Sequence, residues 1–235
     1  MDIKQFLKLE FSGWKRLEVI ALISILLLIF VNAVLVNDSP IAVISAVCGI
    51  MYTVIAGKGK ISCYFFGLIG SSFYGYLAFH HALYGNLFLY VGYYIPMQIL
   101  GFFQWQKHLD KTTHEIIKTR LSKSELVRVV LISIFGCLVA ISILKYFKDG
   151  CCYIDGITTV LSLVGMYLTV KRCIEQWIVW TIVNVLSILM WVGVVMHGGK
   201  TYSTVIMWIV YLVLGIYFFF KWKGDMSNED LAELN

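Results

Sequence analysis

The sequence has few charged residues. Asp, Glu, Lys and Arg make up 14% of its 235 residues, whereas hydrophobic residues make up 60%. Soluble domains contain about 25% charged residues, so this composition excludes an ordinary soluble protein. Several apolar stretches approach the roughly 20 residues that a helix needs to cross the hydrocarbon core of a bilayer. We therefore expect an all-α integral membrane protein folded as one compact bundle.

The signatures of common enzyme classes are also missing. The chain has no Gly-x-Ser-x-Gly and no His-Glu-x-x-His. The Gly-Lys-Gly-Lys stretch at 57–60 lacks the glycine spacing and the hydroxyl of an ATP-binding P-loop. Asp155 and Glu175 stand at the ends of apolar segments, whereas proton coupling needs an intramembrane carboxylate or histidine. We therefore expect no enzyme and favour a uniporter, with sodium coupling through backbone carbonyls left open.

The six cysteines form no metal-binding framework. No cysteine pair has zinc-ligand spacing with histidines, and Cys151 and Cys152 are simply adjacent. Cys48, Cys63 and Cys137 fall in apolar segments, where cysteine acts as a small apolar residue. We expect neither a metal nor a cofactor.

Eight apolar segments can be drawn as membrane spans. The first is longer than the 7–15 apolar residues of a signal peptide, so we interpret it as a retained helix. The eight are Leu17–Val36, Ile41–Ala56, Ser62–Leu83, Leu87–Gln106, Val127–Tyr146, Tyr153–Val170, Ile174–Met196 and Tyr202–Trp222.

The distribution of positive charge agrees with eight spans. With this count, 16 of the 19 Lys and Arg residues lie on one side of the membrane, and only Lys145, Lys148 and Lys200 lie on the other. The positive-inside rule then places both termini in the cytoplasm. The net charge of +5 thus indicates orientation and contact with membrane lipids. It does not indicate nucleic acid, because no basic stripe carries interleaved aromatic residues.

The connection from Lys107 to Glu125 is the one stretch with soluble character. Ile116, Ile117 and Leu121 would share one side of a helix there, surrounded by basic residues. An amphipathic helix on the inner membrane surface fits this pattern, and so does a solvated linker.

The chain contains a weak internal repeat. Spans two to four and six to eight end in Phe-Gln-Trp-Gln-Lys (103–107) and Phe-Lys-Trp-Lys-Gly (220–224), and Tyr-x-x-Gly-x-x-x-Ser (64–71) aligns with Trp-x-x-Trp-x-x-x-Asn (177–184). The fifth span would act as a linker that makes the two copies parallel, a transporter architecture with the substrate near the midplane between the halves. The expected parts are residues 1–37 (N-terminal segment and extra helix), 38–106 (first repeat), 107–147 (connection and linker helix), 148–224 (second repeat) and 225–235 (tail).

Trp177, Trp180 and Asn184 form the strongest candidate site. Their i, i+3, i+7 spacing places them on one helix face. An amide in hydrocarbon must find a hydrogen-bond partner, which a neighbouring helix or a ligand can supply. Two indoles and an amide match an aromatic ring with polar substituents, and indole faces attract cations by about 0.5–2 kcal/mol.

The fourth and eighth spans offer further candidates. Tyr90, Tyr94 and Gln98 form an i, i+4, i+8 stripe, and Gln98 at mid-span also needs a polar partner. Pro96 removes a backbone donor and favours a kink. In the eighth span Tyr211 stands three residues after a tryptophan. Such aromatic stripes serve packing as readily as binding.

These motifs, the 3+1+3 layout and the aromatic-rich spans resemble the PnuC family of bacterial vitamin transporters, from about Ser39 to Lys223. The resemblance implies two parallel triple-helix bundles as in a full-length SWEET transporter, facilitated diffusion, a homotrimer and a location in the bacterial inner membrane. It also implies nicotinamide riboside as substrate, with Trp177 and Trp180 beside its ring, and Asn184 and Gln98 bonded to its ribose or carboxamide.

Three alternatives to this substrate and role stay open. Ring stacking alone does not separate the riboside from thiamine or riboflavin, and the chain could be the substrate-binding subunit of a larger importer. The mononucleotide is disfavoured, because no arginine falls in a proposed mid-span to bind its phosphate.

Overall fold

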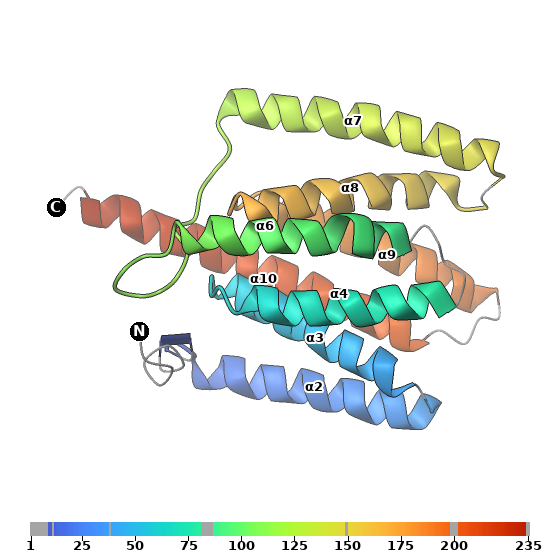
Figure 1. Ribbon diagram of the computed structural model, residues 1–235, viewed down its shortest axis with the longest axis horizontal. Helices are drawn as coiled ribbons and strands as arrows, with labels where there is room; N and C mark the ends of the chain where they lie inside the picture. Colours follow the sequence, from blue (N-terminus) through green and yellow to red (C-terminus); the bar gives the residue numbers. More distant parts are fainter. Residues whose placement is uncertain are drawn as a thin grey trace. The chain divides into compact units, whose positions relative to one another are not determined.

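The structure is a computed structural model that describes residues 9–10, 12–37, 39–80, 87–148, 150–197 and 202–233. Almost all of these residues are helical, and their only β pairing is two isolated bridges. The chain divides into two compact units, residues 1–117 and 118–235 (Figure 1). The expected all-α architecture is confirmed.

The helical elements that the structure describes in unit 1 form a chain of neighbours. They are α2 (Arg16–Val36), α3 (Pro40–Gly57), α4 (Cys63–His80), the π-helix η1 (Phe88–Tyr94) and α6 (Ile95–Gln106). α2 packs on α3, α3 on α4, and α4 on both η1 and α6. The Ser39 hydroxyl caps α3 by accepting the Ala42 N–H at 3.1 Å, and Pro40 occupies the first turn, where no N–H is needed.

The fourth expected span is divided into η1 and α6. The division falls next to Pro96, which has no N–H to donate and whose ring would collide with the carbonyl four residues earlier. The Ile95 N–H reaches back five residues to the Tyr90 carbonyl, as in a π-helix. The kink predicted at Pro96 is thus a change of helix type.

Unit 2 repeats this order of neighbours with four helices. They are α7 (Lys123–Tyr146), α8 (Cys152–Val170), α9 (Gln176–Met196) and α10 (Tyr202–Glu233). α7 packs on α8, α8 on α9, and α9 on α10. A capping box between Ser122 and Glu125 begins α7. α10 continues through residue 233, so the expected tail is helical there, while residues 234–235 and 1–8 lie outside the described part.

Six of the described helices are long and apolar enough to cross a membrane: α2, α3, α7, α8, α9 and α10. α4 is not among them because glycine, serine and tyrosine lower its hydropathy, and η1 and α6 are each too short. No residue of α7 is buried, and its large apolar side chains face outward. A surface of this kind requires lipid around it, so the chain is a multi-pass membrane protein.

The connection between the units is extended, so the interpretation as an amphipathic helix is wrong. Leu109 pairs with Ile116 in antiparallel fashion, and Ile116 donates its N–H to the Gly59 carbonyl at 2.9 Å. In unit 2, Thr119 pairs with Cys173. Ile116 is 3% exposed and Ile117 is 50% exposed, which is the two-residue alternation of a strand.

Candidate functional site

Trp177 is buried against α10. Its ring lies 5.4 Å from that of Phe218 and 5.6 Å from that of Trp222, which it meets edge-on at 82°. The indole Nε1 is buried and has no hydrogen-bond partner among the described residues. Because an unpaired buried donor costs about 1–3 kcal/mol, this N–H is available to a polar ligand.

Trp180, one turn further along α9, contacts α8 instead. Its Nε1 donates to the Thr169 hydroxyl at 3.3 Å, and that hydroxyl donates to the Gly165 carbonyl at 2.9 Å. A Cβ on Gly165 would lie 2.9 Å from Cε2 of the Trp180 ring, so the indole is this close to α8 only because residue 165 is glycine. The two tryptophans therefore contact different helices.

Asn184 lies on the side of α9 that faces α10, and it is buried. Its Nδ2 is 3.8 Å from the position that a Cβ on Gly215 would occupy. Unlike Oε1 of Gln98 and Nε1 of Trp177, its amide atoms are not among the fully buried polar atoms that lack a partner in the described residues.

Gln98 is the buried amide residue of unit 1. Its Nε2 donates to the Ser71 hydroxyl at 3.0 Å, while its buried Oε1 has no partner among the described residues. A Cβ on Gly67 would lie 2.8 Å from the Tyr52 ring and 3.1 Å from Cδ of Gln98. The amide is thus enclosed by a tyrosine, a serine and the bare backbone of α4, with one acceptor unused.

Tyr90 and Tyr94 belong to a group of tyrosines in unit 1. The rings of Tyr74 and Tyr90 stack at 4.1 Å and 25°, and those of Tyr90 and Tyr94 meet edge-on at 4.9 Å. Tyr211 in unit 2 contacts the ring of Trp208 at 6.0 Å, and the buried Trp208 Nε1 has no partner within the described residues.

The two units share one pattern of contacts. Tyr64 meets Trp105 at 5.1 Å and 82°, as Trp177 meets Trp222. Gln98 stands seven residues before Trp105, and Gly215 stands seven residues before Trp222. In unit 1 the amide residue Gln98 is on α6 and its small neighbour Ser71 is on α4. In unit 2 the amide residue Asn184 is on α9 and its small neighbour Gly215 is on α10.

Sequence reasoning missed Tyr52 and Tyr74 as neighbours of these residues. Tyr52 falls in the apolar α3 and carries no motif. Ser71, aligned only as the repeat counterpart of Asn184, bonds directly to Gln98.

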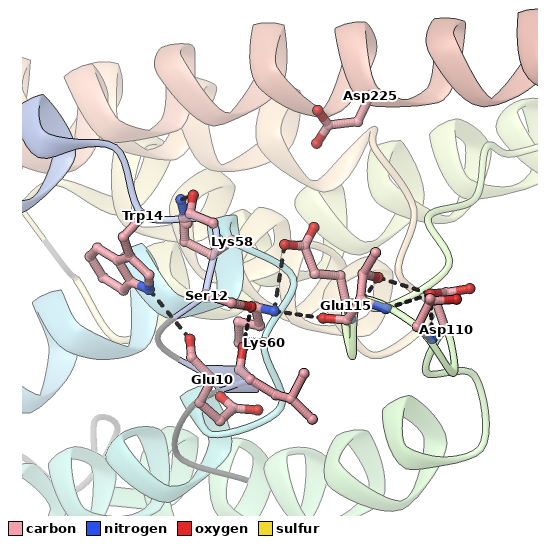
Figure 2. Close-up of polar contacts among 12 residues, drawn as sticks. Glu10, Ser12, Trp14, Lys58, Lys60, Asp110, Glu115 and Asp225 are labelled. Atoms are coloured by element: carbon pink, nitrogen blue, oxygen red, sulfur yellow. Dashed lines mark hydrogen bonds and ion pairs between the residues drawn. The ribbon is translucent and has the colours of Figure 1, made fainter. Parts of the chain in front are cut away.

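Two buried lysines form a separate cluster at the loop between α3 and α4. Lys58 is 1% exposed, and its Nζ lies 2.6 Å from Oε2 of Glu18 and 2.7 Å from the Gly13 carbonyl. The Trp14 ring lies 5.2 Å from the same Nζ. Figure 2 shows Trp14 and Lys58 in this cluster. The cluster ties α2 and the segment before it to the α3–α4 loop.

Lys60 ties the same loop to the connection. Its Nζ donates to the Thr113 carbonyl at 2.9 Å and lies 3.5 Å from Glu115 (Figure 2). Asp110 closes that turn by accepting the N–H groups of Thr113 and Thr112, which lower the pKa of its carboxyl group. Neither lysine is free to bind a ligand. The described residues contain no group of three His, Cys, Asp or Glu that could hold a metal ion.

Comparison with known proteins gives concordant matches. The family model described as nicotinamide mononucleotide transporter matches residues 39–224. A relative from Neisseria mucosa named nicotinamide riboside transporter PnuC is 35% identical over 217 residues, 90% of this chain and 82% of its own. A relative of the same name from Haemophilus influenzae is 32% identical over 227 residues, 94% and 96% of the two chains. The crystal structure titled vitamin B3 transporter PnuC is 34% identical and covers 95% of this chain and 97% of its own, with a TM-score of 0.81.

Proposed function

Because the chain belongs to the nicotinamide mononucleotide transporter family, and is therefore a transporter and not an enzyme, we propose that it carries nicotinamide riboside. The observation that carries the proposal is a buried amide in each unit, Gln98 next to the Tyr52 ring at Gly67 and Asn184 two turns after Trp177 on α9. The buried Oε1 of Gln98 and the buried Nε1 of Trp177 have no hydrogen-bond partner among the described residues. A buried amide in this condition is favourable only when a ligand completes its bonds.

The chemistry of the riboside fits these groups. Its pyridinium ring is a flat cation, which the faces of Trp180 and the unit 1 tyrosines would attract. Its carboxamide and ribose hydroxyls would bond to Gln98, Asn184 and the Trp177 N–H. Trp177, Trp180 and Asn184 with Tyr211 in unit 2, and Gln98, Tyr90 and Tyr94 in unit 1, are the residues to which we assign the substrate.

The positions of the arginines favour the riboside over the mononucleotide, the substrate in the family model's description. The four arginines stand at 16, 120, 128 and 172, outside α3, α4, α6, α8, α9 and α10. A phosphate among indoles and amides of these helices would lack a bidentate arginine partner. Phosphorylation inside the cell would then trap the riboside, and facilitated diffusion would suffice for uptake.

We further propose eight crossings of the bacterial inner membrane with both termini in the cytoplasm. The one-sided distribution of Lys and Arg supports this orientation. The matching contacts of Tyr64 with Trp105 and of Trp177 with Trp222 support parallel SWEET-like repeats. A homotrimer rests on the family resemblance alone, and native mass spectrometry of the detergent-solubilised protein tests it.

Calorimetry on purified protein tests the substrate. We expect the riboside to bind with micromolar affinity, and Trp180→Ala to weaken binding at least tenfold through loss of a ring contact with a cation. Ile178→Ala, a truncation at an exposed position of the same helix, is the control and should bind normally. If thiamine, riboflavin or the mononucleotide binds more tightly than the riboside, that compound is the substrate instead. If none of the four compounds binds, the proposal is wrong. Co-purification of an ATPase would favour a subunit of a larger importer.

A further inference from the structure

The π-helix η1 changes which residues share a face with Gln98. In an α-helix, eight residues turn about 800°, so Tyr90 would lie about 80° away from Gln98 around the helix axis. A π-helix has about 4.4 residues per turn, and with this twist from Tyr90 to Tyr94 the offset falls to about 10°. The drift expected of an i, i+4, i+8 stripe is thereby cancelled.

The ring contacts agree with this alignment. Tyr90 stacks on Tyr74 of α4, the helix that also carries Ser71, the partner of Gln98. Tyr94, between Tyr90 and Gln98 along the helix, meets Tyr90 edge-on. A tyrosine row therefore ends at the buried amide with the unused acceptor.

Pro96 explains why this segment is not α-helical. It has no N–H for the carbonyl of Gly92, and its ring would collide with that carbonyl in an α-helix. The observed bond from the Ile95 N–H to the Tyr90 carbonyl is the longer π type.

We propose that Pro96 is a positioning residue for the substrate: it holds η1 in π geometry, and that geometry places Tyr90 in line with Gln98 to bind an aromatic cation. The alignment deepens the proposed function and rests on it for the identity of the ligand.

The helix register is tested without any ligand. In Tyr74→Cys/Tyr90→Cys protein, a short bis-methanethiosulfonate reagent, which forms a disulfide with each cysteine and releases two sulfinates, should link the two positions. Digestion with mass spectrometry measures the linked peptide against the single-cysteine controls. Pro96→Ala restores the missing donor and permits an α-helix, which should lower the yield severalfold. Deletion of Gly92 in the Pro96→Ala background shortens the spacing from Tyr90 to Gln98 to seven residues. In an α-helix, residues seven apart are only about 20° from alignment around the helix axis. This deletion should therefore restore the yield of the cross-linked peptide.

Binding is then measured with residues 74 and 90 native. Pro96→Ala should weaken riboside binding about three- to tenfold, the loss of one aromatic contact, and the added deletion of Gly92 should recover it. General damage to the helix would not be repaired by removing a residue. Unchanged cross-linking in Pro96→Ala would show that proline does not hold the π geometry. Reduced cross-linking with unchanged riboside affinity would show that the alignment of Tyr90 with Gln98 does not affect binding. If the native protein binds no riboside, the proposed function is wrong. The cross-linking result still shows whether Pro96 sets the orientation of Tyr90.

Discussion

At the scale of single residues, glycines decide how close the aromatic side chains come to the helices beside them. Gly165 lets Trp180 lie on α8, and Gly67 leaves room for Tyr52 beside Gln98. The spacing of Trp177 and Trp180 predicted correctly that they stand on adjacent turns of one helix. It did not reveal that one meets α10 and the other α8, because sequence spacing does not identify the neighbouring helix.

Gly165→Ala tests the placement of Trp180. The new methyl group would lie 2.9 Å from the indole, so the ring must move. We expect riboside affinity to fall about tenfold or more, because Trp180 is assigned to the substrate. Calorimetry measures the affinity.

Gly193→Ala is the matched control. No atom lies within 4 Å of the added methyl group, so affinity should stay unchanged while helix propensity improves by up to about 1 kcal/mol. Equal affinities in the two variants would mean that the placement of Trp180 against α8 is irrelevant to binding.

At the scale of elements, the lengths of the apolar segments predicted where helices lie, but they did not predict that one of them is a π-helix. The expected span Ile41–Ala56 is found as Pro40–Gly57, because hydrocarbon thickness and the Ser39 cap determine its ends. The π geometry of η1 had no signal except Pro96. For the connection, an amphipathic helix and a solvated linker were both expected; the helix alternative fails because the structure places Ile116 and Ile117 on opposite sides.

The attachment of α2 to the α3–α4 loop depends on the buried pair of Glu18 and Lys58. Glu18→Gln leaves the lysine charge buried without its counter-charge, which costs about 3–5 kcal/mol. We expect the melting temperature in detergent to fall by several degrees. The double variant with Lys58→Met removes both charges and should recover most of this loss.

Lys171→Met is the control for loss of an ion pair. The Lys171–Glu125 pair spans 3.8 Å and its side chains are 44% and 36% exposed, so it contributes at most about 1 kcal/mol. A melting temperature that falls equally in Glu18→Gln and Lys171→Met would contradict a special role for the buried pair.

At the scale of the whole molecule, contacts divide the chain into two compact units, and the expected 3+1+3 layout stays a prediction. α7, expected as a separate linker, belongs to the same compact unit as α8, α9 and α10. α2, expected as an extra helix, packs on α3, just as α7 packs on α8. If η1 and α6 are taken as one segment, the helices named above give four segments in the described part of each unit. Hydropathy could locate the segments, but the packing between them depends on side-chain contacts that one sequence does not reveal.

Membrane orientation is tested with a native thiol. Cys151 is exposed in the short loop between α7 and α8, which the proposed orientation places outside the cytoplasm. We expect a membrane-impermeant maleimide to label it in spheroplasts. The Cys151→Ser variant should lose this label, since Cys152 beside it is buried. Labelling that requires disruption of the membrane would reverse the proposed orientation.

Four segments per unit is an even number, and this bears on how such a chain could arise. An ancestor with four crossings begins and ends on the same side of the membrane. Tandem duplication of its gene would therefore insert both copies in one orientation, without any inverted intermediate. The later divergence is visible in the buried amide, which is Gln98 on the last segment of one copy and Asn184 on the third segment of the other. Such an exchange would make the two copies chemically unequal, each with its amide on a different segment.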